Sequence, residues 1–137
     1  EMAKTRGIEL AELIRGIQFD VSNDVITTTK DIRSNGHTQG GSTTTAVTEV
    51  AIDTFAHATY RAARYVVAMS SGSDFHSTEI VVVHDGSAVT LTQYGTLKSS
   101  NLASFDADIS GTDVRLKVTP ASSSSTVIKF DRTTVDA

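Results

Sequence analysis

The feature that most constrains the fold is the stretch from Arg64 to Tyr94, which consists of three consecutive runs of β-forming residues. Val, Ile, Thr and aromatic side chains suit a pleated sheet, and the polar residues around Gly72 and Gly86 are typical of turns between strands. Asp85 followed by Gly86 between two apolar runs predicts a β-hairpin. The middle run is apolar at four consecutive positions, Ile80 to Val83, so it presents apolar side chains on both faces of the sheet. One face can form the core of the domain, and the other needs a second cover from this chain or from a neighbour.

The composition excludes several classes of protein. The 137 residues are enough for one domain with a real core, or for one domain and a short additional segment. The chain has no cysteine, which excludes disulfides, thiolate metal sites and a cysteine nucleophile. A net charge of −4 without a basic block argues against binding to nucleic acid. No run approaches the roughly 20 apolar residues that a membrane-spanning helix needs, so we expect no membrane insertion.

Residues 5–17 carry the helical pattern of the chain. Ile8, Leu13, Ile14 and Ile17 recur on one face of the predicted helix, with acidic and basic residues on the other. A helix of about three turns is marginal alone in water, so this apolar stripe must pack against something. Two alternatives stay open: the stripe packs against its own domain, or it forms a seam with copies of itself.

Two segments separate this helix from the rest of the chain. Residues 18–29 alternate apolar and polar side chains around Asn23 and Asp24, which predicts a small hairpin. Residues 31–45 are polar, contain glycine and are almost free of apolar side chains, so we expect an exposed linker. The sequence therefore predicts a helix, hairpin and linker over residues 1–45, serving assembly or attachment, and a β domain over residues 46–137.

Period-two alternation continues through the rest of the chain. It is clear in residues 46–55, 105–109 and 114–118, and a last strand follows the serine-rich segment near residue 124. Seven or eight strands with frequent turns predict an all-β fold, an antiparallel β-sandwich that is jelly-roll-like, preceded by the short helix and hairpin. The residues expected to be mostly buried are Val50, Ile52, Val67, Val89, Leu91, Phe105, Ile109, Leu116 and Val118.

One acidic segment has the spacing of a calcium loop. Asp106, Asp108 and Asp113 alternate toward the glycine turn at Gly111. An EF-hand loop requires a bidentate glutamate at its twelfth position, and counting from Asp106 this position is Lys117. We therefore expect the charged outer face of a strand and no metal site.

The histidines give no catalytic pattern. His37, His57, His76 and His84 are scattered, without the spacing of a metal site. His76 and Glu79 point to opposite faces of a regular strand, and Asp85 beside His84 most simply serves the hairpin turn. The pair Gly40-Gly41 lies in the predicted linker and not between a strand and a helix, so it is no phosphate-binding loop. We expect no catalytic residue, no cofactor and no enzymatic activity.

Several dispersed segments of the β domain also match a known pattern. These are residues 58–67 (ATYRAARYVV), 78–80 (TEI), 83–86 (VHDG), 94–96 (YGT), 105–111 (FDADISG), 114–116 (VRL) and 118–121 (VTPA). Together they resemble a β domain that recurs in virion structural proteins of marine tailed phages, particularly cyanophages, over roughly residues 46–135. The amino-terminal sequence GIELAEL at residues 7–13 is similar to the connectors that precede such domains in fibre-like proteins.

This resemblance implies a non-enzymatic building block of a virus particle: a tail fibre, a neck or head fibre, or a protein of the capsid surface. Such proteins are often homotrimers in contact with other virion proteins. The alternative is a module that binds a receptor or a host surface glycan, because a β-sandwich does not fix a function. Tyr60, Tyr65 and Tyr94 are the aromatic candidates for a sugar platform, although all three look at least partly structural. The residues expected at an oligomer interface are Ile8, Leu13, Ile14, Ile17, Ile80 and Val82.

Overall fold

The computed structural model describes residues 17–20, 25–28 and 36–137 of the chain. The chain divides into two compact units, Glu1–Arg33 and Ser34–Ala137. In the first unit, β1 (Ile17–Asp20) pairs antiparallel with β2 (Val25–Thr28), so the hairpin predicted for residues 18–29 is confirmed. The predicted helix, with its stripe residues Ile8, Leu13 and Ile14, lies outside the described residues, and Ile17 begins β1. No helix in the described ranges is long and apolar enough to cross a membrane.

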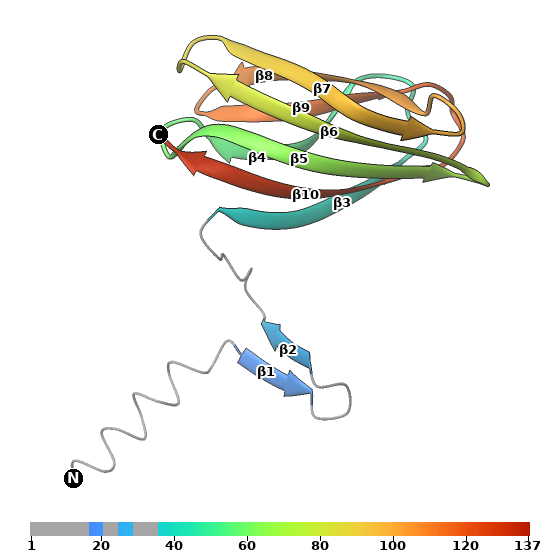
Figure 1. The fold of residues 1–137 in the computed structure, drawn as a ribbon, viewed down its shortest axis with the longest axis horizontal. Coiled ribbons are helices and arrows are strands. Elements are labelled where there is room, and N and C mark those ends of the chain that lie inside the picture. The colour runs from blue at the N-terminus through green and yellow to red at the C-terminus, as the bar shows by residue number, and fades with distance from the viewer. Residues whose placement is uncertain (1–16, 21–24, 29–35) are drawn as a thin grey trace. The chain divides into compact units, whose positions relative to one another are not determined.

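The second unit is entirely β-structure, with two antiparallel sheets (Figure 1). Its strands are β3 (His37–Thr44), β4 (Val50–Ala56), β5 (Tyr60–Ser71), β6 (Asp74–His84), β7 (Val89–Lys98), β8 (Ala103–Ser110), β9 (Asp113–Pro120) and β10 (Thr126–Asp136). The large sheet has the order β3-β10-β5-β6-β7, and the small sheet has the order β4-β9-β8. The all-β prediction is confirmed, and the two sheets share one core, as in a β-sandwich.

The strand order combines nested pairs with a meander. The first and last strands of the unit, β3 and β10, pair with each other in the large sheet, and β4 pairs with β9 in the small sheet. This nesting is the jelly-roll-like feature of the fold. Strands β5, β6 and β7 pair consecutively within one sheet, as the stretch from Arg64 to Tyr94 predicts. The turn after β6 contains Gly86 with a φ of 99°, a left-handed conformation that glycine adopts without steric cost.

The core lies between the two sheets and is made by alternate residues of each strand. Tyr65, Val67, Ile80 and Val82 of the large sheet face Val114, Leu116 and Val118 of the small sheet, among others. Of the residues predicted to be buried, Val67, Leu116 and Val118 are fully buried. The others, which pack against the core as partly buried side chains, are Val50, Ile52, Val89, Leu91, Phe105 and Ile109. The core faces of the strands that carry these nine residues were therefore correctly assigned from their alternation.

The predicted linker is wrong for residues 37–44, because they form β3 and pair with β10 along their whole length. The boundary between the two units accordingly falls after Arg33 and not after residue 45. A polar, glycine-bearing strand is stable at this edge because its partner supplies the hydrogen bonds and the apolar contacts. The ring of Phe130 occupies the space beside Gly40, where an added Cβ would lie 2.4 Å from its Cζ.

Candidate functional site

The outer face of the large sheet, which points away from the small sheet, collects the exposed apolar residues of the described chain. Strand registers place six of the seven large exposed hydrophobic residues on this face. They are Val66, Phe75, Val83, Tyr94, Leu97 and Val135, whereas Val47 lies between β3 and β4. Leu97 is 72% exposed and Val135 is 63% exposed. Singly scattered apolar residues are ordinary on a surface, whereas a set on one sheet face makes that face a candidate for protein contact.

Residues in register form rows across this outer face. One row runs through Gln39, Asp131, Val66, Glu79 and Tyr94, with one residue from each of the five strands. Every second residue of a strand points to the same side, so the members of a row share a face. The row therefore passes from polar side chains on β3 and β10 to an aromatic ring on β7.

In the next row, the size of the side chains differs from one strand to another. It runs through Gly41, Lys129, Ala68, Ser77 and Leu97. The β3 and β5 positions carry glycine and alanine, whereas the β7 position carries leucine. The face is therefore low over β5 and high over β7, whereas the Lys129 side chain lies over Gly41, where an added Cβ would be 2.7 Å from its Cδ.

A β-bulge in β7 produces the high side. Ser77 is opposite Leu97 and Glu79 is opposite Tyr94, so β7 contains one residue more than β6 between these pairs. Gly95 in this bulge has a φ of 61°, and the buried hydroxyl of Thr78 donates to the carbonyl of Tyr94 at 3.2 Å. Residues three apart in a regular strand point to opposite faces, and the extra residue brings Tyr94 and Leu97 to the same face. We call the exposed group Phe75, Tyr94 and Leu97 the ridge.

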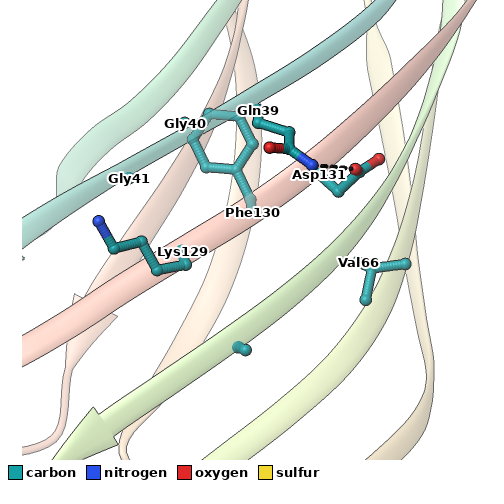
Figure 2. Close-up of a pocket in the computed structure, with 8 residues that line it drawn as sticks. Gln39, Gly40, Gly41, Val66, Lys129, Phe130 and Asp131 are labelled. Carbon is teal, nitrogen blue, oxygen red and sulfur yellow. Dashed lines mark hydrogen bonds between the residues drawn. The ribbon is translucent and has the colours of Figure 1, made fainter. Parts of the chain in front are cut away.

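The low side is a hollow of about 560 Å³ over β3, β10 and β5. Figure 2 shows Lys129 and Asp131 on β10 and Val66 on β5, with the glycines of β3 alongside. Ala68 also lines it. We call this depression, lined by Gly41, Val66, Ala68, Lys129 and Asp131, the hollow. The small side chain of Ala68 leaves this part of the row low, and the side chain of Lys129 borders the depression.

Charged side chains of both signs accompany these features. Arg64 on β5 donates two hydrogen bonds to one carboxylate oxygen of Glu79 on β6, and this contact lowers the pKa of Glu79. At the β3 edge, Nε2 of His37 lies 2.6 Å from the Asp131 carboxylate, to which Gln39 also donates at 3.1 Å. These contacts hold the pKa of Asp131 below its ordinary value. Both carboxylates therefore stay ionised near neutral pH.

The two β6 residues predicted at an oligomer interface, Ile80 and Val82, face the core of their own unit. Ile80 and Val82 are completely buried in the core of their own unit, so they have no surface to offer a second copy. Val81 is partly buried and Val83 is 45% exposed, and both face outward. The run from Ile80 to Val83 required apolar contact on both faces, but its sequence did not say which pair faces the core. The oligomer itself stays a prediction.

The acidic segment of β8 forms ion pairs on the outer face of the small sheet. Nζ of Lys117 lies 3.1 Å from Asp108, 3.5 Å from Asp106 and 2.7 Å from Glu49. Arg115 makes a two-pronged contact with Asp108 and lowers its pKa to about 2. The cationic position beside these carboxylates is therefore taken by lysine and arginine, in agreement with the charged strand face expected from the sequence.

Structural roles account for His84 and Asp85. Nε2 of His84 lies 2.7 Å from the carbonyl of Tyr60, and Nδ1 accepts a hydrogen bond from the Gly86 backbone at 3.0 Å. The carboxylate of Asp85 accepts from the backbone N–H groups of Ser87 and Ala88, which lowers its pKa to about 2. Both side chains hold the hairpin turn, and neither contacts the other in a catalytic arrangement.

His76 and Glu79 point to opposite faces, as the strand alternation predicts. His76 is buried between the sheets, where its Nδ1 accepts a 3.3 Å hydrogen bond from the backbone of Leu102. Burial, with a contribution from Lys98, lowers the pKa of His76. Within the described ranges, no three histidine or acidic side chains come close enough together to hold a metal ion.

No protein-family model matches this chain, and no curated protein sequence does. In fold the chain is similar to the tailspike protein of Acinetobacter phage vB_ApiP_P1, with a TM-score of 0.49 and 18% identity, over 80% of this chain and 23% of that one. It is also similar to the tailspike of Acinetobacter baumannii phage AM24, with a TM-score of 0.38 and 9% identity, over 79% of this chain and 28% of that one.

A third similar structure is tailspike protein gp49 of Acinetobacter baumannii bacteriophage Fri1, which is described as a capsular polysaccharide depolymerase. Its TM-score is 0.33 and its identity 11%, over 92% of this chain and 23% of that one. This chain spans about a quarter of the length of these tailspike chains. The cyanophage part of the sequence resemblance stays a prediction.

Proposed function

We propose that this chain is a non-enzymatic structural module of a tailed-phage virion, in a fibre-like or particle-surface protein. The sequence resemblance over residues 46–135 supports a virion protein, and the outer face of the large sheet supports a role through protein contact. The outward side chains of the doubly apolar strand β6, Val81 and Val83, lie on this face and would gain their second cover from such a contact.

The gathering of exposed apolar residues on the outer face is the observation that carries this proposal. Leaving one such side chain in water forfeits roughly 1.5–3 kcal/mol relative to full burial. Leu97 is 72% exposed, and Phe75 and Tyr94 stand beside it on the ridge. Monomeric proteins rarely leave apolar patches of more than a few hundred Å² uncovered. We therefore expect another protein surface to cover this face in the virion.

The non-enzymatic part of the proposal is supported by the contacts of the polar residues. The imidazole of His84 is held by the Tyr60 carbonyl and by the Gly86 backbone, and Asp85 is held by the turn. The acidic group around Lys117 is paired. Each of these side chains stabilises a turn or a strand face, and none is arranged as a nucleophile beside a base.

The direct test is peptide mass spectrometry of gradient-purified particles of the phage that encodes this chain, with the soluble lysate as control. We expect peptides of this chain in the particle fraction, in several copies per particle. Peptides confined to the soluble fraction would overturn the virion assignment. Polysaccharide cleavage by the purified chain that His84→Ala abolishes, without loss of folding, would overturn the non-enzymatic part.

A second candidate function is glycan binding on the same face. Tyr94 is 43% exposed and lies in register with the carboxylate of Glu79, which also pairs with Arg64. An aromatic ring beside charged hydrogen-bonding groups is an arrangement that binds sugars. A glycan array probed with the whole chain and with Tyr94→Ala would test it, because specific binding lost in this variant would favour the glycan-binding module over the structural one.

A further inference from the structure

We propose that the edge of β7 that points away from β6 is a docking site for an extended segment of another protein, which pairs antiparallel with residues 89–93. The segment would add a strand to the large sheet. In the described ranges β7 pairs with β6 alone, and the order of the large sheet ends at β7. We call the backbone of residues 89–93 on this side the β7 edge. It is distinct from the outer face of the sheet and does not depend on the virion assignment.

The register with β6 determines which backbone groups of β7 point away from the sheet. At the hairpin turn, the backbone N–H of Asp85 donates to the carbonyl of Ala88 at 3.1 Å. Hydrogen-bonded and non-hydrogen-bonded pairs alternate along an antiparallel ladder, so Thr90 and Thr92 bond to β6. The residues whose N–H and C=O groups point away from β6 are Val89, Leu91 and Gln93. A partner strand can therefore form a regular ladder over this segment.

The other three edge strands carry features that disfavour pairing with a further strand. Strand β8 carries the acids Asp106 and Asp108. Strand β4 is interrupted by a bulge between Ala51 and Asp53. Strand β3 has no apolar side chain to offer a partner. Charged side chains and bulges are the usual means by which proteins protect sheet edges from strand addition.

The β7 edge lacks this protection. Strand β7 contains no proline, and its one charged residue, Lys98, is its last. The bulge at Gly95 lies beyond residues 89–93, so the segment before it is regular. A long, regular and uncharged edge is a surface to which a further strand can pair.

Core side chains beside the β7 edge are incompletely covered. Strands β7 and β8 are edge strands on the same side of the two sheets (Figure 1). Five of the eight partly buried apolar residues that pack against the core lie on these two strands, and they are Val89, Leu91, Phe105, Ala107 and Ile109. An added strand with apolar side chains on its inner face would cover part of this surface, so the contact would combine backbone pairing with apolar burial.

A single extended segment fits this edge better than a second folded copy. A copy joined through its own β7 would bring its β8 to the same side, where Asp106 is 66% exposed. Acids of the two β8 strands would then approach each other, and like charges disfavour such a contact. A segment that alternates apolar and uncharged polar residues avoids this repulsion and places apolar side chains beside Leu91.

Amide hydrogen exchange of the full chain, labelled with nitrogen-15, tests the predicted register. We expect the amide hydrogens of Leu91 and Gln93 to exchange several-fold faster than those of Thr90 and Thr92, because the latter bond to β6. Slow exchange at Leu91 in the chain alone would overturn the inference, since the edge would already be covered.

The binding probe is a short synthetic peptide that alternates valine and threonine between terminal lysines. We expect it, at up to millimolar concentration, to slow exchange at Leu91 and Gln93 several-fold and to leave the resonances of Val66 and Ala68 on the outer face unchanged. In antiparallel pairing, the valines that point inward also direct their backbone to β7. N-methylation of the valines should therefore abolish binding, whereas N-methylation of the threonines should not. No binding, or the reverse methylation pattern, would overturn the proposed pairing.

Gln93→Pro tests the edge from the side of the protein. Proline is tolerated in an edge strand where its nitrogen faces solvent, so this variant should fold, as circular dichroism verifies. It removes one outward N–H group and should weaken binding of the peptide about tenfold. The matched control, Gln93→Thr, loses the same side chain but keeps the N–H group, and should bind as the unmodified chain does.

Equal binding by the two variants would overturn the inference. So would a dimer of the chain alone that Gln93→Pro dissociates, because a second copy would then occupy the β7 edge. If Gln93→Pro does not fold, the N-methylated peptides still decide between pairing and no pairing. These results are separable from the particle test: absence of the chain from purified particles would remove the virion assignment without changing the binding of the peptide.

Discussion

Asp53 of β4 and Arg132 of β10 form an ion pair of 2.6 Å that joins the small sheet to the large one. The hydroxyl of Tyr65 donates to the same carboxylate oxygen at 2.9 Å, and Arg132 also donates to the carbonyl of Thr54 at 3.0 Å. A second guanidinium nitrogen of Arg132 reaches the Thr38 hydroxyl on β3 at 3.1 Å. One buried arginine thus connects three strands, and burial, together with the charge of Asp53 and the hydrogen bond to it, raises the pKa of the Tyr65 hydroxyl.

Arg132→Met should strongly destabilise the second unit. Removing one partner of a buried ion pair typically costs about 3–5 kcal/mol, because the remaining charge is left without a counter-ion. In this variant Asp53, whose side chain is only 13% exposed, keeps the hydrogen bond from the Tyr65 hydroxyl. The free energy of unfolding from urea titration measures the loss.

The matched control for this prediction is Lys129→Met. Lys129 lies on the same strand as Arg132, and its side chain points to the outer face of the sheet. Surface changes of this kind usually stay within about 0.5 kcal/mol. Replacing both Asp53 and Arg132 by apolar residues should cost less than Arg132→Met alone, since no unpaired charge remains. Equal losses for Arg132→Met and Lys129→Met would show that the ion pair contributes nothing to stability.

Gly40→Ala should destabilise the edge of the large sheet, because the new Cβ would lie 2.4 Å from Cζ of Phe130. Overpacking of this kind typically costs about 1–3 kcal/mol. Phe130→Leu shortens the opposing side chain, so the cost of Gly40→Ala should be smaller in that background. A double-mutant cycle from urea unfolding measures this coupling. Additive losses would mean that the two side chains do not compete for the same space.

Stability should decrease as the pH falls below about 6.5, and His76 should be one cause. Burial holds the pKa of His76 below its ordinary value of 6.5 in the folded chain. Between the lowered pKa and 6.5 the unfolded chain binds a proton that the folded chain does not, so acid favours unfolding. His76→Gln keeps an acceptor for Leu102 but has no proton to gain. The urea midpoint of the variant should therefore depend less on pH below 6.5, with a constant offset from the unmodified chain above pH 7.5.

A second loss of stability should follow in stronger acid, between about pH 4 and pH 2. The contact with Arg115 lowers the pKa of Asp108 from 3.8 to about 2, so its ion pairs stabilise the fold above pH 4 and are lost as it becomes protonated. Asp108→Asn should flatten part of this slope in the urea midpoint. The rest should persist, because the pKa values of Asp85 and Glu79 are lowered as well. An unchanged slope in the variant would show that these ion pairs are too well solvated to matter.

Most of the β-structure was predictable because the signal is local. Period-two alternation in β9 gives the buried set Val114, Leu116 and Val118 directly, and the Asp85-Gly86 turn locates the hairpin between β6 and β7. These features depend on neighbouring residues and on one buried face, both of which the sequence contains.

The candidate site was less predictable, because its features depend on partners far away in the sequence. Strand β3 has almost no apolar pattern of its own and is held by β10, about 90 residues later. Alternation alone places Tyr94 and Leu97 on opposite faces of the sheet. Only the bulge at Gly95 brings both side chains to the same face. Similarly, the uniform run from Ile80 to Val83 has no parity signal to identify its core face.

Two truncations should separate the first unit from the second. Deletion of residues 1–33 follows the boundary between the units, so we expect the remaining chain to unfold with an unchanged free energy. Deletion of residues 1–45 also removes β3, and with it the backbone pairing of β10, the cover of Phe130 and the hydrogen bond that Arg132 donates to Thr38. An unpaired edge strand is prone to aggregation, and we expect this shorter chain to lose several kcal/mol of unfolding free energy or to precipitate.

Urea unfolding and light scattering of both truncations measure the difference. If the two behave alike, β3 contributes nothing to the domain, whereas unfolding on removal of residues 1–33 would make the first unit part of its core.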